Sequence, residues 1–274
     1  MSNRLFTCLV ALLSASIVSC SSANNRSDHQ LVLTGSSTVA PLVLEMAKRF
    51  ESQHPGVRVD VQTGGSSRGI ADAMRGLADI GMASRSLREE EYELHAFAIA
   101  RDGVCVILHR DNPIEALTDA QIVAIYSGEI VNWSDVGGHD APITVVNKAA
   151  GRSTLELFLE YFDLSSTEIR ADVVIGDNEQ GIKTVAGNSN AIGYVSIGTA
   201  EFDASAGIAI KLLPVGTVAA SVDNVATGSF PLSRPLNLVT RSEPNGLAAT
   251  FIEFARSDSV HDLIREQYFV PIVP

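Results

Sequence analysis

The chain has 274 residues, of which 46% are hydrophobic and 19% are charged, and its formal net charge is −12. This is the composition of a globular protein with room for one large domain or two medium ones. It argues against a nucleic-acid-binding surface, because binding to a phosphate backbone needs clustered lysine and arginine. An acidic protein can still bind a small anion where local hydrogen-bond donors outweigh the overall field.

The N-terminus has the pattern of an export signal. Arg4 supplies a positive charge, and residues 5–18 are almost wholly apolar or small, a run too short to span a bilayer comfortably. The run ends in IVSC at 17–20, which resembles the lipobox of bacterial lipoproteins. That resemblance implies cleavage before Cys20 and attachment of lipid to Cys20, with the polar residues that follow as a tether. The alternative is an ordinary signal peptide in which this cysteine is incidental.

The leader also predicts the location of the protein. We expect it to be exported and lipid-anchored at the cell envelope. In a Gram-negative cell this means the periplasm, with retention at the outer membrane because Ser21 rather than aspartate follows Cys20. In a Gram-positive cell it means the outer face of the cell membrane. Cys105 has no intrachain disulfide partner in the body of the chain, so we expect a small buried apolar residue there.

Strands and helices alternate along the rest of the chain, which predicts an α/β fold with a largely parallel sheet. In the first part, apolar residues predict strands at 31–33, 57–61 and 79–82. Apolar residues at three- and four-residue spacing predict a helix over 39–53. A second helix is expected to carry Ile70, Met74 and Leu77.

The same alternation continues beyond residue 100. Residues 104–108 are continuously apolar, which is typical of a strand buried on both faces. Thr118 is expected to cap a short helix that reaches Tyr126 and ends at Gly128. Further strands are predicted at 143–146, 173–175, 192–195 and 236–239, and further helices at 153–162, 247–255 and 260–268.

Two buried strands, 104–108 and 192–195, bracket a middle segment of the size of a small α/β unit. If both strands cross between lobes, the chain leaves the first lobe, builds the second and returns. A cleft then forms where strand C-termini and helix N-termini meet. The predicted organisation is a signal peptide at 1–19, a lipidated tether at 20–29, a first lobe of 30–108 plus 199–274, and a second lobe of 109–198.

Three loops share one design, in which glycine and small hydroxyl residues join a strand to a helix. They are GSST at 35–38, GSSRG at 65–69 and GRST at 151–154. The first N–H groups of a helix have no partner within the helix and carry partial positive charge, and glycine lets a ligand approach the backbone. Hydroxyls add donors without charge, so each loop is a candidate oxyanion cradle. A single such loop is a weak indication, since its serine or threonine is more often a helix cap, but three in two expected lobes favour binding.

Around these loops the sequence resembles the phosphate-binding lipoproteins of Pst-type ABC transporters, in the periplasmic-binding-protein type II superfamily. The matching motifs are TGSSTVAP at 34–41, GGSSRGI at 64–70, ADIGMASR at 78–85, RDGV at 101–104, DNP at 111–113, YSG at 126–128, NWSDVGG at 132–138, GRST at 151–154 and AIGY at 191–194. The resemblance implies an α/β fold of two lobes, each a mixed sheet flanked by helices, with the ligand in the cleft between the lobes.

The resemblance also implies, position by position, which residues bind the anion. They are Ser37, Thr38, Ser66, Ser84, Lys148, Arg152, Ser153 and Thr154. Lys148 stands where the family usually has an arginine that pairs with the anion, and Arg152 stands where it has a small donor. Ser84 replaces an aspartate that in some members accepts the proton of phosphate. These departures bear on which tetrahedral oxyanion is bound, and Arg85 is expected either behind the site or on the solvated surface.

The expected function is therefore that of a monomeric solute-binding protein, not an enzyme, that captures phosphate or a related oxyanion for an ABC transporter. Its partner would be the transporter permease, and no cofactor, metal or nucleic acid is expected. A surface anion sensor or adhesin without transport fits the same residues. A serine hydrolase is the rival enzyme, because residues 65–69 fit G-x-S-x-G with Ser67 as nucleophile, but no oxyanion-hole motif precedes them.

Two other features have simple structural interpretations. Residues 89–91, three consecutive glutamates, are expected to form a solvated helix start, where negative charge is favourable. Trp133 is expected in the core rather than as a stacking platform for a sugar. The six histidines show no metal-ligand spacing.

Overall fold

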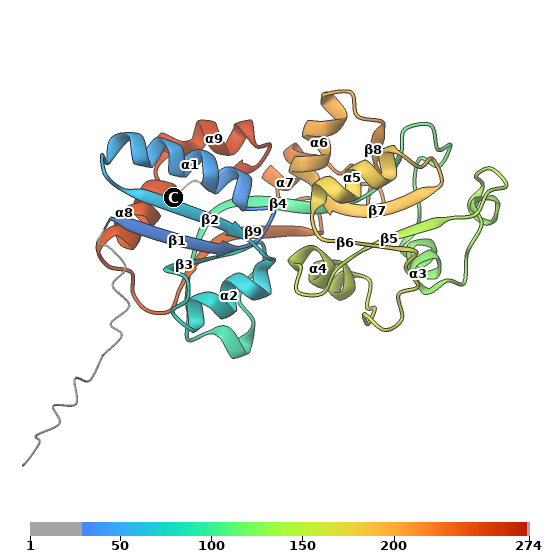
Figure 1. Ribbon diagram of the computed structural model, residues 1–274. Helices are drawn as coiled ribbons and strands as arrows, with labels where there is room; N and C mark the ends of the chain where they lie inside the picture. The colour runs from blue at the N-terminus through green and yellow to red at the C-terminus, as the bar shows by residue number, and fades with distance from the viewer. Residues whose placement is uncertain (1–28, 273–274) are drawn as a thin grey trace, which may run out of the picture.

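The computed structural model describes residues 29–272, so Cys20 and the expected leader lie outside the described residues. Within that range no helix has both the length and the apolar character needed to cross a membrane. Figure 1 shows two lobes side by side, each a layer of strands with helices on both faces. In the first lobe α1 (Ala40–Gln53) lies on one side of the strands and α2 (Ser66–Met74) on the other.

The strands join into a 10-stranded sheet of order β2-β1-β3-β9-β4-β7-β5-β6, with β8 and β10 paired to β4. They are β1 (Gln30–Gly35), β2 (Arg58–Thr63), β3 (Ile80–Ala83), β4 (His95–His109), β5 (Thr144–Lys148), β6 (Val173–Ile175), β7 (Ala191–Ser196), β8 (Ile210–Leu212), β9 (Ser233–Thr240) and β10 (Val270–Pro271). The group β1, β2 and β3 is parallel, as is the group β5, β6 and β7, whereas β9 is antiparallel to β3 and β4, and β7 is antiparallel to β4. The sheet is therefore mixed, with parallel strands concentrated in each lobe.

Helices follow most of the parallel strands. Besides α1 and α2 they are α3 (Asp119–Ser127), α4 (Ser153–Tyr161), α5 (Asn178–Ala186), α6 (Ile197–Ser205), α7 (Val222–Ala226), α8 (Gly246–Ala255) and α9 (His261–Glu266), with short 3₁₀ helices η1 (Glu89–Glu91), η2 (Trp133–Val136) and η3 (Asp258–Val260). Thr118 caps α3 by accepting from the N–H of Gln121, and Gly128 ends it in the left-handed conformation, as predicted.

Two separate clusters of buried apolar side chains form the cores of the lobes. The first draws on β1, β3, α1, α8 and α9, and the second on β5, β7 and α3 to α6. The long strand β4 contributes Ile99 to the first cluster and residues 104–108 to the second. The other connection is β9, since Leu232 packs in the second cluster and Leu236 in the first. Both strands run between the lobes in Figure 1.

The strand that leads the chain back from the second lobe to the first differs from the one expected from the sequence. The strand expected to cross back, at 192–195, is part of β7, which pairs with residues 104–108 of β4 and belongs to the second cluster. Residues 210–232 also contribute to that cluster. The reason is that β9, not β7, pairs with both β3 and the first half of β4.

Several elements are longer than predicted or were not predicted. The strand β4 begins at His95 because backbone pairing with β9 continues through Arg101 and Asp102, whose charges hide the strand pattern. Helix α5 has Gly181 in its middle, a residue that weakens helices, yet a Cβ there would lie 2.7 Å from Ile175. Close packing on β6 therefore explains a glycine that helix propensity alone disfavours.

Individual burial expectations have mixed outcomes. Trp133 and Cys105 are each 1% exposed, so both are core residues as predicted. The expectation of a fully solvated start at 89–91 is wrong for Glu91, which is 8% exposed. Its carboxylate accepts two hydrogen bonds from the guanidinium of Arg85, at 2.6 and 2.8 Å, so the pair is buried together.

Candidate functional site

The strand-to-helix loops of both lobes meet at a small cavity, where the empty space between atoms, including its opening to solvent, is about 220 Å³. Its lining residues are Ser36, Ser37, Thr38, Gly65, Ser66, Ser84, Lys148, Arg152, Ser153, Thr154, Gly176 and Asn178. Every oxyanion-binding residue expected from the sequence is in this set. The lining residues of the first lobe come from the β1–α1 loop, the start of α2 and the end of β3. Those of the second lobe come from β5 and the starts of α4 and α5.

Helix N-termini from both lobes face the cavity. Helices α1, α2 and α4 have no side-chain cap at their first turn. Ser66 and Ser153 are the first residues of α2 and α4 rather than their caps, so their hydroxyls are not used in capping. The buried Oγ of Ser153 has no hydrogen-bond partner in the described part of the chain. The N–H groups of Thr38 and Val39 donate to Ser36 Oγ, and that of Ser67 donates to the carbonyl of Gly151. The positive helix ends and the Ser153 hydroxyl are therefore what this space offers to an anion.

A chain of hydroxyls connects three serines of the first lobe. Ser36 Oγ accepts from the N–H of Thr38 at 3.2 Å and from that of Val39 at 3.3 Å, so its own hydrogen is free to donate to Ser84 Oγ, 3.0 Å away. Ser66 Oγ accepts from the N–H of Ser84 at 3.1 Å. Since an occupied hydroxyl oxygen has its hydrogen left to give, Ser66 and Ser84 can present donors to the cavity.

One arginine orients the hydroxyl of a threonine in each lobe. Arg234 donates to Thr154 Oγ1 at 3.0 Å and to Thr38 Oγ1 at 3.4 Å. Thr38 Oγ1 also accepts from Asn178 at 3.2 Å, which fills both of its lone pairs. Each threonine therefore turns its O–H hydrogen away from Arg234 and toward acceptors on the other side.

Sequence reasoning missed Arg234, which is 3% exposed. Its guanidinium binds the buried carboxylate of Asp102 at 2.9 and 3.2 Å, and Asp102 also accepts from the hydroxyl of Ser196 and the N–H of Gly198. Asn178 was missed as well. Its signal was a fourth strand-to-helix loop after β6, in which Asp177 rather than a serine caps the helix.

Lys148 is the last residue of β5 and is 3% exposed. Its Nζ donates to the carbonyl oxygen of Asp177 at 2.7 Å and to Asn178 Oδ1 at 3.0 Å. Burial, together with the positive charges of Arg234 and Arg152, lowers the pKa of Lys148 to about 7, and the charge of Asp177 opposes this only in part. The ammonium is therefore held in the cavity wall at a cost that a bound anion would offset.

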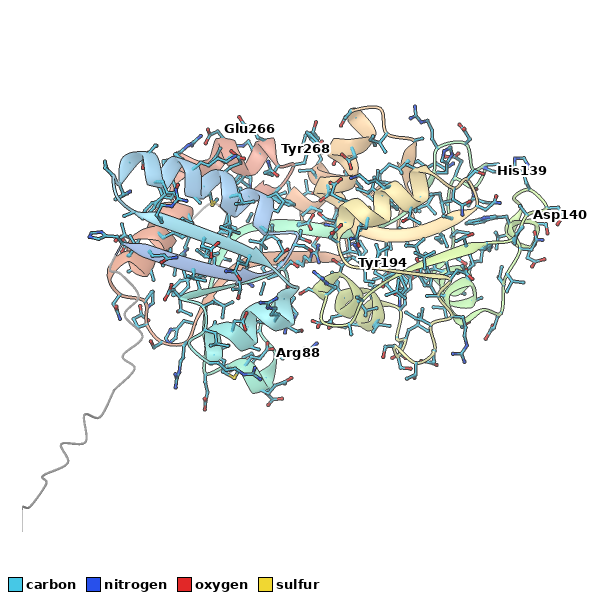
Figure 2. All side chains as sticks on the ribbon, in the orientation of Figure 1. Arg88, His139, Asp140, Tyr194, Glu266 and Tyr268 are labelled. Atoms are coloured by element: carbon cyan, nitrogen blue, oxygen red, sulfur yellow. The ribbon has the colours of Figure 1, made fainter. Side chains whose placement is uncertain are left out.

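Ion pairs between the lobes also join α4 to the loop after β3. Glu156 of α4 binds Arg85 at 2.7 Å and Arg88 at 3.1 Å, both from the loop after β3. Figure 2 shows Arg88 at this lower side of the boundary between the lobes, near α2 and α4. Arg85, 9% exposed, is thus a buried residue behind the site and not a solvated one. The backbone N–H of Ser67 completes the junction by donating to the carbonyl of Gly151 at 3.3 Å.

Ser67 does not have the surroundings of a hydrolase nucleophile. Its hydroxyl donates to Glu156 Oε1 at 2.9 Å, and no hydrogen bond among residues 29–272 joins it to a histidine. His139, one of the later histidines, lies at the far tip of the second lobe beside Asp140 (Figure 2). In the same range, no group of histidine, cysteine, aspartate and glutamate side chains could hold a metal ion.

A larger hollow, of about 1070 Å³, lies at the outer end of the first lobe between the start of β1 and the loop before α8. Its charged lining residues are Asp79, Arg241 and Glu243. Two carboxylates against one guanidinium disfavour a small anion there. A small anion is therefore expected in the cavity between the lobes, although the volume of that cavity is smaller.

Comparison with known proteins gives a consistent result. Residues 21–259 match the family model described as "PBP superfamily domain". The chain belongs to the PBP superfamily. Over 253 residues it is 27% identical to the phosphate-binding protein PstS of Bacillus subtilis, covering 90% of this chain and 82% of that protein.

Solved structures of this superfamily agree with the fold. One is a phosphate ABC transporter substrate-binding protein of Clostridium perfringens, solved with bound phosphate. It has a TM-score of 0.82 and 33% identity, over 89% of this chain and all (100%) of that one. An ABC-type phosphate transport receptor of Vibrio cholerae has a TM-score of 0.73 and 33% identity, over 89% of this chain and 100% of its own. The predicted fold class, a two-lobed α/β protein of periplasmic-binding-protein type II with mixed sheets, is confirmed.

Removing Arg234 tests how much the buried ion pair contributes to stability. We expect Arg234→Met to lower the free energy of unfolding by about 3–5 kcal/mol, because Asp102 would remain buried without its partner. Arg101, the chain neighbour of Asp102, is the control, because its guanidinium donates to the carbonyl of Ala226 at an exposed position and has no ion pair among residues 29–272. Arg101→Met should cost about 0.5 kcal/mol or less. Urea denaturation measures both, and equal losses for the two variants would contradict the assignment.

Proposed function

We propose that the protein captures phosphate, or a related tetrahedral oxyanion, in the cavity between its lobes and delivers it to the permease of an ABC transporter. The observation that carries the proposal is the convergence of uncapped helix N-termini with hydroxyls whose oxygens are already occupied. Each of these hydroxyls still has a hydrogen to donate, and a small oxyanion consists of acceptors. The curated relative from Bacillus subtilis and the solved relatives from Clostridium perfringens and Vibrio cholerae are named for phosphate.

The lining of the cavity favours the negative charge of an oxyanion more than the presence of a proton on it. Lys148 and Arg152 are cations in its lining, whereas none of the lining side chains is a carboxylate. Ser84, where some relatives are expected to have an aspartate, can donate to sulfate or accept from phosphate. A carboxylate there would repel sulfate, which has no proton to share. We therefore expect sulfate to compete with phosphate more effectively than in relatives with aspartate.

Two features support a hinged binding mechanism. The buried clusters meet near residues 102–104 on β4 and 232–236 at the start of β9, so we propose that the lobes are divided there and move about these two strands. The described arrangement has direct contacts across the junction, including those of Glu156 and of Thr38 with Asn178. These contacts belong to a closed form, which binding would favour.

Calorimetry with the protein lacking its leader tests the function. We expect one phosphate bound per chain, with sulfate, arsenate and molybdate as competitors. Thr154→Val should weaken phosphate binding about tenfold or more, since a hydrogen bond to a charged group contributes about 1.5–3 kcal/mol. Thr184→Val, which removes a hydroxyl bonded within its own helix α5, should leave affinity unchanged. Folded protein that gives no heat with millimolar phosphate would refute the proposal.

The closing contact between two glycines gives a second prediction. Gly65 has φ +94°, and a Cβ there would lie 2.6 Å from the carbonyl oxygen of Gly151 in the opposite lobe. Gly65→Ala should therefore hinder closure, lower phosphate affinity at least about tenfold and reduce the ligand-induced compaction seen by small-angle scattering. Gly76→Ala is the control, because φ is +67° but nothing lies within 4 Å. Wild-type binding by Gly65→Ala would exclude this mode of closure.

We also propose a lipid anchor at Cys20, supported by the lipobox-like sequence before it. Cys20→Ala should move the protein from the membrane fraction to the soluble envelope fraction of its own cell, because the thioether carrying the lipid cannot form. Cys8→Ala, which changes a cysteine within the expected leader, is the control and should remain membrane-bound. Unchanged membrane association of the Cys20→Ala variant would mean that the anchor lies elsewhere.

A further inference from the structure

The buried cations around the cavity differ in how they are neutralised. Arg234 is paired with Asp102, and Arg85 is paired with Glu91 and Glu156. Lys148 is as deeply buried as Arg234, each being 3% exposed. No ion pair found within residues 29–272 includes it, and its Nζ hydrogen bonds end on an uncharged carbonyl and an uncharged amide oxygen. Lys148 is therefore a buried amine without a paired counter-ion among the described residues.

The groups packed around Lys148 do not supply the missing charge. Arg234 on β9 and Arg152 at the start of α4 are both positive, although Asp102 neutralises the first. Asp177 precedes α5, and its charge offsets these effects on the Lys148 pKa only in part. Its carboxylate accepts from the N–H of Gln180, and no ion pair within residues 29–272 joins it to Lys148 Nζ. Tyr194 on β7 accepts from the backbone N–H of Lys148 and stays neutral, because burial raises the pKa of its phenol. The nearest unfilled place for negative charge is the cavity itself, which Lys148 lines.

We propose that the bound oxyanion is the counter-ion of Lys148, so that above neutral pH each dianion that binds is accompanied by a proton taken up on Lys148 Nζ. The inference rests on the proposed function. The proton comes from solvent or buffer. The free state holds a neutral amine, and the complex holds an ammonium beside HPO₄²⁻, so one dianion and one proton enter together. No bond other than the N–H is made.

The direction of the pH effect follows from the two states. In the free protein the pKa of Lys148 is about 7, so at a pH of about 8 the amine is mostly neutral. A bound dianion favours the ammonium and raises that pKa. Phosphate is already a dianion in this range, so binding takes up close to one proton. Affinity should then fall about tenfold from pH 8 to pH 9. At a pH of about 6 the lysine is already charged, and binding instead releases the proton of the phosphate monoanion.

Calorimetry in two buffers with different ionisation enthalpies measures the number of protons exchanged. For the wild type at pH 8 we expect about one proton taken up per phosphate. Lys148→Arg keeps a permanent positive charge, so it should bind phosphate with almost no proton uptake and a nearly flat affinity from pH 8 to pH 9. Lys183→Arg changes an exposed lysine of α5 and should behave as the wild type.

The possible results separate this inference from the proposed function. Absence of phosphate binding at every pH would refute the function. Binding with no proton uptake in the wild type, or with full uptake in Lys148→Arg, would leave the function intact and overturn the inference. If Lys148→Arg fails to fold, nuclear magnetic resonance of lysine Cε groups in the wild type decides. One lysine should titrate near neutral pH without ligand and above about pH 9 with phosphate, and a spectrum in which no lysine does so refutes the inference.

Discussion

The buried ion pair between Arg234 and Asp102 is the interaction on which the rest of the site depends. It lies where β4 and β9 pass from one lobe to the other, so a single guanidinium contacts Thr38 of the first lobe and Thr154 of the second. The partner carboxylate in turn holds the start of α6 through Gly198. An arginine can do this because its planar donors are fixed in direction, whereas a lysine in the same place would have no preferred geometry.

The positive character of the cavity is local, in a chain whose net charge is −12. Helix ends, oriented hydroxyls and two cations act over a few ångströms in a dehydrated space, where their fields are weakly screened. Two acidic side chains near the cavity are held in ion pairs, Asp102 with Arg234 and Glu156 with Arg85 and Arg88. The overall acidity of the surface therefore says little about which ligand the interior accepts.

The sequence was informative where function depends on consecutive residues. Ser66, Ser153 and Thr154 follow a strand and begin a helix, and that local order is enough to place them at the carboxyl edge of a sheet. Arg234 could not be found in this way, because its role arises from β9 pairing with β4, which joins residues more than 130 positions apart in sequence. Charged residues within β4 and a glycine within α5 also hid elements whose identity is decided by packing rather than by propensity.

The contact between Gly65 and Gly151 has a consequence for how a ligand would be released. The two lobes meet there backbone against backbone, with Ser67 N–H on the carbonyl of Gly151 and the side chain of Arg152 beside Gly65. Release of a bound anion past this contact would require the two loops to move apart. A partner that binds both lobes could therefore release the anion by separating them, without contacting the anion itself.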